Sequence, residues 1–246
     1  MICVILSAGM GRRLMPLTRD IPKPLLEING RTLLERMVKN CMNCAIADFI
    51  VVAGYNKKKV HDACKSLEEK FGISVRVIDN DDYDVTNTSV STYLASSYIE
   101  NANPDDFILI NGDNVVDPKI IEEIAGSANT GMVVDNFKTL NEESFKLIIE
   151  DGIIKEIGKG IDIYSSTGEF IGISKVVKED INAFNDILGG LIEEDRQNYY
   201  DFAFKALSRK TAIDYVYTNG LEWTEIDDAN DWQMAKKLID KFENCP

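Results

Sequence analysis

The first half of the chain alternates short apolar runs with longer stretches in which apolar residues recur at helical spacing. The apolar runs predict buried strands at residues 2–6, 48–53, 74–78 and 107–110. The helical spacing predicts helices at residues 32–44, 57–71 and 89–100. Strands that alternate with helices are typical of a mainly parallel sheet with helices on both faces. The pattern therefore predicts an α/β fold of three layers.

After Asp113 the pattern is less regular. Short strands are predicted at residues 131–135, 145–150, 153–157, 170–174, 213–218 and 222–226, and helices at residues 177–194, 199–210 and 231–242. Asp151-Gly152 is typical of a hairpin turn and indicates a small antiparallel extension of the sheet. No linker, repeat or low-complexity tract interrupts the sequence, so we expect a single domain over residues 1–246.

A loop rich in glycine and basic residues follows the first predicted strand. Its notable residues are Gly9, Gly11, Arg12, Arg13 and Lys23. Glycines let backbone N–H groups approach a phosphate closely, and the cations neutralise its charge. Gly-x-Gly alone is weak evidence, because ordinary turns between a strand and a helix also use it. A dinucleotide-binding fold is disfavoured because Leu14 replaces the third glycine, and a P-loop because no Gly-Lys-Ser or Gly-Lys-Thr follows.

Composition narrows the classes of partner. The chain has 246 residues, 45% of them hydrophobic, and a formal net charge of -14. This acidity argues against a nucleic-acid binder or an anionic-membrane binder, since both need a basic surface. No apolar run is long enough to span a bilayer or to act as a signal peptide. The five cysteines lack the spacing of a disulfide framework or a zinc site, although Cys41 and Cys44 form a CxxC, so a cytoplasmic location is expected.

The string LSAGMGRRLMPLTRDIPKPLLEING, residues 6–30, resembles the signature of nucleotidyltransferases that activate sugar phosphates and phospho-alcohols. That signature is usually LAAGxGxRL followed by PKPLxxxxGxP, and Ser7 stands where the family usually has alanine. The resemblance implies a Rossmann-like three-layer α/β/α nucleotidyltransferase fold. It also implies a nucleotide-binding half at about residues 1–117 and an acceptor-binding half at about 118–246. We expect the chain to lack the C-terminal β-helix that some members carry.

Two acidic segments follow predicted strands, where ligands bind in open α/β sheets. Asp113 ends the run FILINGD, and Glu225 and Asp227 lie in WTEIDD, where the alternation of a strand would point both to one face. Asp113 alone could be an ordinary turn residue. Both segments resemble positions that hold Mg²⁺ in the family, so Asp113 and Asp227, then Glu225, are the expected ligands. Asp228 and Asp231 are expected to cap the last helix.

The segment NDDYDVTNTSVSTYLASSYI, residues 80–99, resembles the base-contacting loop of cytidylyltransferases for phosphocholine, aminoethylphosphonate and inositol phosphate. Amide and hydroxyl groups suit cytosine, which offers both donors and acceptors. The resemblance implies that the nucleotide is contacted by Leu6, Ala8, Gly9, Gly11, Arg12, Asn87, Ser89 and Gly112. For Arg12 a solvent-facing position fits equally well. Among the cations, Arg13 is assigned to the β and γ phosphates, and Lys23 to the α phosphate and the acceptor.

The acceptor pocket is expected to hold an amine headgroup. Aromatic faces and carboxylates bind such cations, and the residues that supply them are Glu169, Tyr199, Tyr200, Asp201 and Trp223. A position in the hydrophobic core accounts equally well for the tyrosines.

Together these features predict a Mg²⁺-dependent cytidylyltransferase that joins CTP to a small phosphorylated or phosphonate acceptor, with release of pyrophosphate. One alternative is a sugar-1-phosphate nucleotidyltransferase that uses UTP, dTTP or GTP. Another is a nucleotide-sensing homologue without catalysis. The sequence leaves the acceptor open, and a homodimer is the default expectation for the oligomeric state.

Overall fold

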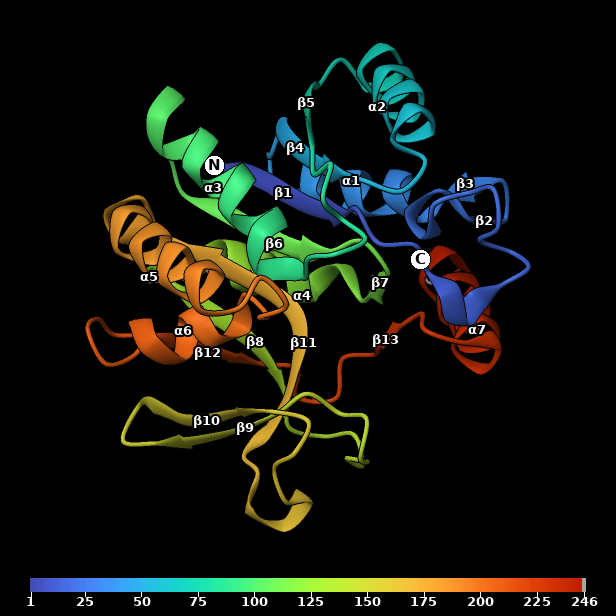
Figure 1. The fold of residues 1–246 in the computed structure, drawn as a ribbon. Coiled ribbons are helices and arrows are strands. Elements are labelled where there is room, and N and C mark those ends of the chain that lie inside the picture. The colour runs from blue at the N-terminus through green and yellow to red at the C-terminus, as the bar shows by residue number, and fades with distance from the viewer. Residues whose placement is uncertain (245–246) are drawn as a thin grey trace.

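The computed structural model describes residues 1–244, and a central sheet organises them (Figure 1). Its parallel part consists of β1 (Ile2–Ser7), β4 (Asp48–Ala53), β5 (Ser74–Asp79) and β6 (Phe107–Asn111). β1 lies between β4 and β6, and β5 lies outside β4. All four strands were predicted to within a residue. β1, β4 and β6 are nearly continuous apolar runs that are mostly buried, whereas β5 at the edge of the sheet alternates apolar and polar residues and is only partly buried.

The other strands of this sheet extend it, mostly by antiparallel pairing. They are β8 (Gly131–Asp135), β9 (Lys146–Glu150), β10 (Ile153–Gly158), β11 (Gly168–Val176) and β12 (Asp214–Tyr217). β11 pairs antiparallel with β6, β8 and β9, whereas β12 runs parallel to β8. The β9–β10 hairpin projects away from the parallel strands in Figure 1. Asp151 and Gly152 form its turn, with φ angles of 52° and 73°, as the sequence predicted.

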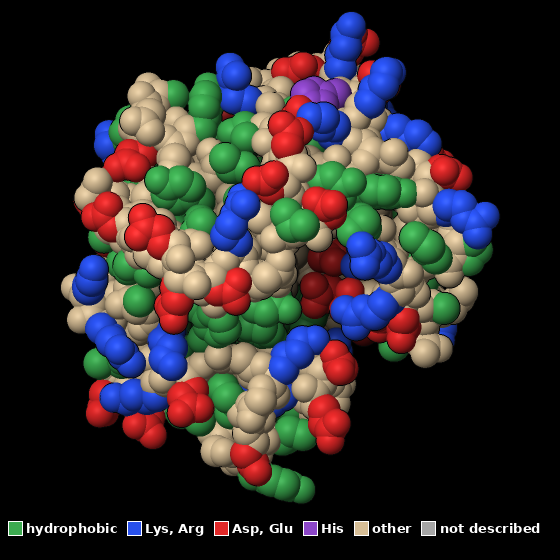
Figure 2. Space-filling view, in the orientation of Figure 1, with side chains coloured by type: hydrophobic (Ala, Val, Ile, Leu, Met, Phe, Trp, Pro, Cys, Tyr) green, Lys and Arg blue, Asp and Glu red, His purple; other side chains and the backbone are tan. Residues whose placement is uncertain are grey.

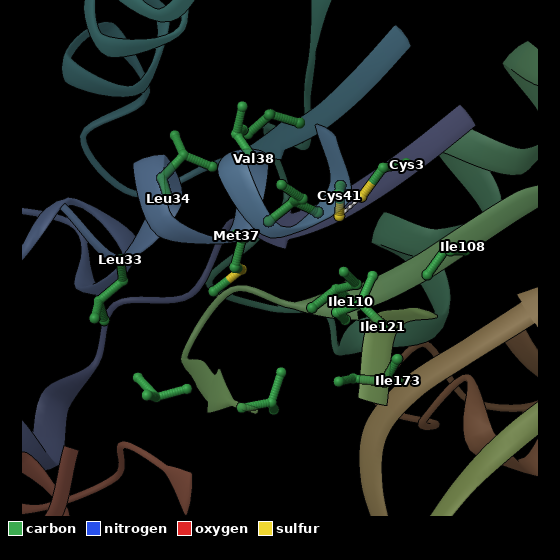
Figure 3. Close-up of a cluster of buried hydrophobic side chains, with 14 of the residues drawn as sticks. Cys3, Leu33, Leu34, Met37, Val38, Cys41, Ile108, Ile110, Ile121 and Ile173 are labelled. Carbon is green, nitrogen blue, oxygen red and sulfur yellow. Dashed lines mark hydrogen bonds between the residues drawn. The ribbon is translucent and has the colours of Figure 1, made fainter. Parts of the chain in front are cut away.

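Helices cover both faces of the sheet. They are α1 (Leu33–Asn43), α2 (Lys57–Phe71), α3 (Thr88–Ala102), α4 (Pro118–Gly126), α5 (Ile181–Glu194), α6 (Asp201–Leu207) and α7 (Ala229–Asn244). Alternate residues of β1 face opposite cores. Cys3 and Ile5 pack with α1, α2, α4 and α7, as Figure 3 shows in part, and Val4 packs with α3, α5 and α6. The predicted three-layer α/β/α fold is thus confirmed.

Several boundaries differ from the predictions. α4 was not predicted, although it follows β7 (Asn114–Val116) with an Asp117 cap and with Ile120, Ile121 and Ile124 at helical spacing. β11 is longer than the predicted strand at 170–174 and continues to Val176, so the helix expected from residue 177 begins only at Ile181. β13 (Trp223–Glu225) pairs antiparallel with β7 in a separate two-stranded sheet. A further small sheet joins β2 (Glu27–Ile28) to β3 (Arg31–Thr32).

Side-chain caps fix the starts of helices that flank the site. Asn87 accepts a hydrogen bond from Thr88 N–H and caps α3. Asp228 accepts from Asn230 and Asp231 N–H, and the Asp231 carboxylate accepts from Asp227 and Asp228 N–H. The expected roles of Asp228 and Asp231 are therefore confirmed, and they fix the chain just after Asp227.

The cysteines of the described residues are free thiols. Cys3 and Cys41 are buried, with their sulfur atoms 3.5 Å apart. The fifth cysteine of the sequence, Cys245, lies outside the described residues. Within residues 1–244, no helix combines the length and the apolar character that crossing a membrane requires.

Candidate active site

A cleft of about 330 Å³ opens at the carboxyl ends of β1 and β6. Its size is at the lower end of the range for small-molecule sites, roughly 300–1,000 Å³. In Figure 2, acidic side chains lie recessed in a hollow bordered by basic ones. The cleft brings together most residues predicted from the sequence, namely Leu6, Ala8, Gly9, Gly11, Arg13, Lys23, Asn87, Gly112, Asp113, Glu169, Tyr199, Tyr200, Asp201, Glu225 and Asp227.

Two glycines shape the loops after β1 and β6. Gly11 has a φ of 58°, in the left-handed region, and its carbonyl accepts a hydrogen bond of 2.7 Å from the Thr18 hydroxyl. A Cβ on Gly112 would lie 2.3 Å from the carbonyl oxygen of Leu6, so a side chain there would force the two loops apart. Backbone groups therefore form this wall of the cleft.

Three carboxylates meet at the centre of the cleft. Oxygen atoms of Asp113, Glu225 and Asp227 lie within 4.8 Å of one another. The pairing of β7 with β13 brings them together, because it places Asn114 opposite Glu225. Ile226 N–H also donates to the Asp113 carbonyl at 3.1 Å. Two segments far apart in the sequence thus form one acidic cluster.

Two cations from the N-terminal loop contact this cluster. Lys23 Nζ lies 2.7 Å from Asp113 Oδ2 and 3.0 Å from Asp227 Oδ1. Arg13 Nη2 lies 2.7 Å from Asp227 Oδ2. Lys23 is largely shielded from solvent, whereas Arg13 is 60% exposed at the mouth of the cleft. The cations and carboxylates predicted from separate motifs therefore form one network.

The pKa values of Glu225 and Lys23 reflect how closely these charged groups lie to one another. Burial raises the pKa of Glu225 well above its ordinary value, and the nearby charges of Asp113 and Asp227 raise it further. For Lys23, burial lowers the pKa, but attraction by Asp113 and Asp227 outweighs burial and the net pKa is raised. Lys23 is therefore a permanent cation. The carboxylates carry more negative charge than this lysine neutralises.

This donor set fits a magnesium ion. Mg²⁺ prefers hard oxygen ligands and is commonly held by one or two carboxylates together with phosphate oxygens. The three clustered carboxylates supply such oxygens. Burial and the charges of Asp113 and Asp227 raise the pKa of Glu225, and a bound cation would stabilise its anion.

A polar loop between β5 and α3 forms another side of the cleft. Asn80 is 2% exposed and donates to Thr86 Oγ1 at 3.2 Å and to Ser91 Oγ at 3.0 Å. Tyr83 packs against Gly54, where a Cβ would lie 2.6 Å from the Cβ of Tyr83. These contacts order the segment that carries Asn87 at the cleft surface.

Aromatic rings and acids form the opposite side. The rings of Phe145 and Tyr199 are 5.4 Å apart, and those of Phe170 and Tyr200 are 6.1 Å apart. Tyr200 is fully buried and its hydroxyl lies 3.4 Å from Asn111 Oδ1. Aromatic faces beside carboxylates favour a cation.

Asp201 and Glu169, the acids on this side, form no ion pair with any residue in the described part of the chain. Burial raises the pKa of Asp201 to about 7, and Asp201 Oδ1 has no hydrogen-bond partner within residues 1–244. Burial also raises the pKa of Glu169, although a hydrogen bond with Ser144 and the charge of Lys138 oppose this. Both carboxyls would be stabilised as anions by a cation in the cleft.

Residues that the sequence reasoning did not select also line the cleft. Lys159 and Glu143 form an ion pair of 2.8 Å at its edge. Lys146 is 1% exposed, and its Nζ donates to the carbonyl oxygens of residues 141, 142 and 144 at 3.0–3.3 Å. This buried lysine fixes the loop that carries Glu143 and Phe145. The Gly158-Lys159-Gly160 turn is a weak signal that could have drawn attention to Lys159.

Three predicted residues lie outside the cleft lining. Trp223 is 7% exposed, and its Nε1–H donates to Asp135 at 2.7 Å while Lys138 covers its ring at 4.0 Å. Ser89 faces the interior because α3 begins at Thr88, and Thr88 and Ser91 line the cleft instead.

Arg12 is the third. It is exposed, its guanidinium lies near the sulfur of Met10, and Arg13 alone of the two arginines lines the cleft. Arg12 therefore faces solvent, as the alternative expectation has it. Arg12, Ser89 and Trp223 lie outside the set of residues that the structure brings together in the cleft, and their contacts with nucleotide or acceptor stay predictions.

Similar proteins were found by sequence. A relative from Aquifex aeolicus, a bifunctional IPC transferase and DIPP synthase, is 27% identical over 97% of this chain, which spans 51% of that relative's length. A CTP:phosphoglutamine cytidylyltransferase from Campylobacter jejuni is 25% identical over 95% of this chain and 98% of its own length. The first match covers about half of a longer protein, and the second covers nearly all of a protein of similar size.

Solved structures share the fold. The CTP:phosphocholine cytidylyltransferase from Streptococcus pneumoniae has a TM-score of 0.77 at 23% identity, over 97% of this chain and 99% of that one. The inositol-1-phosphate CTP transferase from T. maritima has a TM-score of 0.80 at 21% identity, over 99% and 96%. The model of the family described as "Nucleotidyl transferase" matches residues 2–151, which contain the glycine loop, Lys23 and Asp113. The chain belongs to the nucleotidyl transferase family.

Proposed function

We propose that the protein is a cytidylyltransferase that joins CTP to a small phosphorylated acceptor carrying an amine, with release of pyrophosphate. The observation that carries this proposal is the position of Lys23 between Asp113 and Asp227, at the junction of a glycine-lined wall and an aromatic, acidic wall. The first wall suits a triphosphate and the second suits a cationic headgroup. The relatives named for CTP-dependent transfer support the choice of nucleotide.

The main obstacle to this reaction is electrostatic. The acceptor phosphate and the triphosphate are both anions, and like charges about 4 Å apart repel by roughly 4 kcal/mol at an effective dielectric constant near 20. The nucleophile already carries negative charge, so no strong base is required. Catalysis then depends on fixed cations that hold both anions in line.

We assign these tasks to the two cations of the N-terminal loop. Lys23 lies deeper in the cleft and would contact the α phosphate and the incoming oxygen. Arg13 lies at the exposed mouth and would stabilise the β and γ phosphates as pyrophosphate leaves. Backbone groups around Gly9, Gly11 and Gly112 would cradle the triphosphate.

Asp113, Asp227 and Glu225 would hold Mg²⁺, which supplies neutralisation of the phosphate charge. The carboxylates themselves keep Lys23 protonated and oriented, because each of the two aspartates accepts one of its hydrogen bonds. We propose that residues 1–117 contact the nucleotide and that residues 118–244 contribute the acceptor pocket.

The acceptor would lie against Tyr199, Tyr200 and Phe145, with Glu169 and Asp201 facing its amine. Lys159 would attract its phosphate from the edge of the cleft. The base would lie near Asn87 and the polar loop between β5 and α3, where amide and hydroxyl groups can meet the donor and acceptors of cytosine.

The test is a matrix of nucleotides and acceptors. Each of CTP, UTP, dTTP and GTP is incubated with phosphocholine, phosphoethanolamine, aminoethylphosphonate or glucose 1-phosphate, and pyrophosphate release is measured with Mg²⁺ or with EDTA. We expect release with CTP and an amine acceptor, and none with EDTA. Faster release with glucose 1-phosphate and another nucleotide would replace the proposal with a sugar-1-phosphate nucleotidyltransferase. Binding of CTP without release for any acceptor would favour a sensor.

A further inference from the structure

A second cleft of about 240 Å³ lies beside β7 and shares no lining residue with the first. α1, the β6–β7 segment, the start of α4 and the end of α7 form its walls. Its interior is apolar, formed by Leu33, Met37, Ile110, Val115, Val116, Ile121, Ile239 and Phe242. Figure 3 shows Leu33 and Met37 projecting from α1, with Ile110 and Ile121 farther along the same cluster. Such an interior favours an apolar ligand.

The rim of this second cleft is basic. Arg31, Arg36 and Lys39 line it, together with a single acid, Glu243. Both arginines form ion pairs with the Glu243 carboxylate, so a carboxylate already lies at this rim. Lys39 forms no ion pair with any residue in the described part of the chain. In a protein with a formal net charge of -14, this local excess of positive charge favours an anion.

Polar atoms in the wall also lack partners. Asn114 is 4% exposed and donates from Nδ2 to the Ile171 carbonyl at 2.8 Å, but its Oδ1 accepts no hydrogen bond within residues 1–244. Arg36 Nε is likewise buried and without a partner in that part of the chain. Buried polar atoms are nearly always paired, so the Nε–H of Arg36 points to an acceptor at the rim, which a carboxylate would supply, whereas Asn114 Oδ1 calls for a donor.

We propose that this second cleft binds a small anion with an apolar body, of the class of medium-chain carboxylates. The apolar part would fill the space between α1 and β7, and the anionic group would pair with Lys39 at the rim. This site is separate from the cleft of the proposed reaction, and its occupancy would strengthen the binding of Mg²⁺ there.

The coupling follows from the elements that the two clefts share. Asp113 directly precedes Asn114, and Glu225 pairs with Asn114 across the β7–β13 ladder. Asp227 N–H bonds to Asp231 at the start of α7, and the end of the same helix lines the second cleft. A ligand that packs against both β7 and α7 would reduce the freedom of all three carboxylates. Because coupling is reciprocal, Mg²⁺ would strengthen binding of the anion by the same factor.

Binding is tested by calorimetry on the full chain, with octanoate as the probe and 1-octanol as the uncharged control. We expect saturable octanoate binding that is at least tenfold weaker in Lys39→Glu, which reverses the rim charge, and in Asn40→Trp, which fills the mouth. Lys65→Glu makes the same charge change on an exposed position of α2 and should leave the affinity unchanged. Both Lys39 and Asn40 are partly exposed on α1, and thermal unfolding of each variant checks that it is folded.

The absence of saturable binding, equal affinity in Lys39→Glu and wild type, or equal binding of octanol would overturn the site. The coupling is tested by titrating Mg²⁺ with and without saturating octanoate. We expect at least threefold tighter Mg²⁺ binding with octanoate in wild type and no change in Asn40→Trp, and equal affinities in wild type would overturn the coupling. Neither titration uses a nucleotide, so both results are independent of the proposed reaction.

Discussion

Residues 1–117 and residues 118–244 form opposite sides of one cleft by different means. In the first region the cleft surface combines backbone at Gly9, Gly11 and Gly112 with the side chains of Lys23 and Asn87, and Gly112 allows close approach to Leu6. In the second region it consists of large side chains on β11 and before α6, such as Phe170 and Tyr199. A backbone wall recognises phosphate, which many substrates share, whereas a wall of side chains can distinguish one acceptor from another.

The two regions also differ in how they hold charge. In the first, Lys23 is buried with two carboxylates within 3.0 Å. In the second, Asp201 is buried and Glu169 is partly buried, and burial raises the pKa of each. Paired charges are held in place before any ligand binds. Unpaired acids gain a partner only when a cation binds, so their burial favours selectivity over stability.

The largest effect is expected when the paired cation is removed. Lys23→Ala should lower turnover by at least ~10²-fold, the scale of losing one preorganised donor, while the protein stays folded. Arg12→Ala is the matched control, since Arg12 lies outside the cleft lining and its loss should leave turnover nearly unchanged. Pyrophosphate release and thermal unfolding are measured for both variants. Near-normal turnover of Lys23→Ala would contradict the role assigned to the paired cation of the first region.

The next effect concerns stability in the second region. The pKa of Asp201 is raised to about 7, so the folded protein retains a proton that the unfolded chain loses between pH 4 and 7. The free energy of unfolding should therefore fall as the pH rises through this range. Between pH 5 and 7 the wild type should lose about 2 kcal/mol relative to Asp201→Asn, at roughly 1.4 kcal/mol per pH unit. The free energy of unfolding is measured with urea at several pH values. The same pH dependence in wild type and in Asp201→Asn would contradict the raised pKa of Asp201.

A smaller effect should separate acceptor from nucleotide. Glu169→Gln removes a charge from the aromatic wall and should raise the KM for phosphocholine about tenfold, a loss of roughly 1.4 kcal/mol. The KM for CTP should change by less than about twofold, because Glu169 lies on β11 and not on the glycine loops. Initial rates with each substrate varied in turn measure both values. Equal rises in the KM for phosphocholine and the KM for CTP would mean that the two regions do not bind different substrates.

The smallest effect tests the corrected position of Trp223. Trp223→Phe keeps an aromatic ring but removes the hydrogen bond to Asp135, so the protein should lose about 1 kcal/mol of stability. The KM for the acceptor should stay at the wild-type value. A higher acceptor KM without any loss of stability would restore Trp223 to the acceptor pocket.

Local sequence predicted most of the fold in the first region. β1, β4 and β6 are nearly continuous apolar runs, and caps such as Thr32 and Asn87 mark where α1 and α3 begin. The three-residue strands β7 and β13 are too short to show a period, and their pairing depends on contacts between distant segments. The resemblance placed Asp113, Glu225 and Asp227 at one metal site, but the sequence could not show that the pairing of β7 with β13 brings them together.

In the second region the sequence was less informative. Lys159 and Glu143 are charged residues in loops, where charge is common, and only the fold of β9 and β10 brings them to the cleft. Trp223 was assigned to the acceptor because it is aromatic and lies in a segment that the resemblance places near the active site. Its true partner, Asp135, is 88 positions away, and a hydrogen bond at that separation leaves no local pattern.

The β7–β13 ladder also has a consequence for the order in which the protein is made. Asp113 and Glu225 are 112 positions apart, so a growing chain presents its glycine loops and Lys23 long before it can complete the carboxylate cluster. Domains fold as synthesis proceeds from the N-terminus. An unfinished chain that stops before β13 therefore lacks Glu225 and Asp227, and the carboxylate cluster is complete only when β13 has paired with β7.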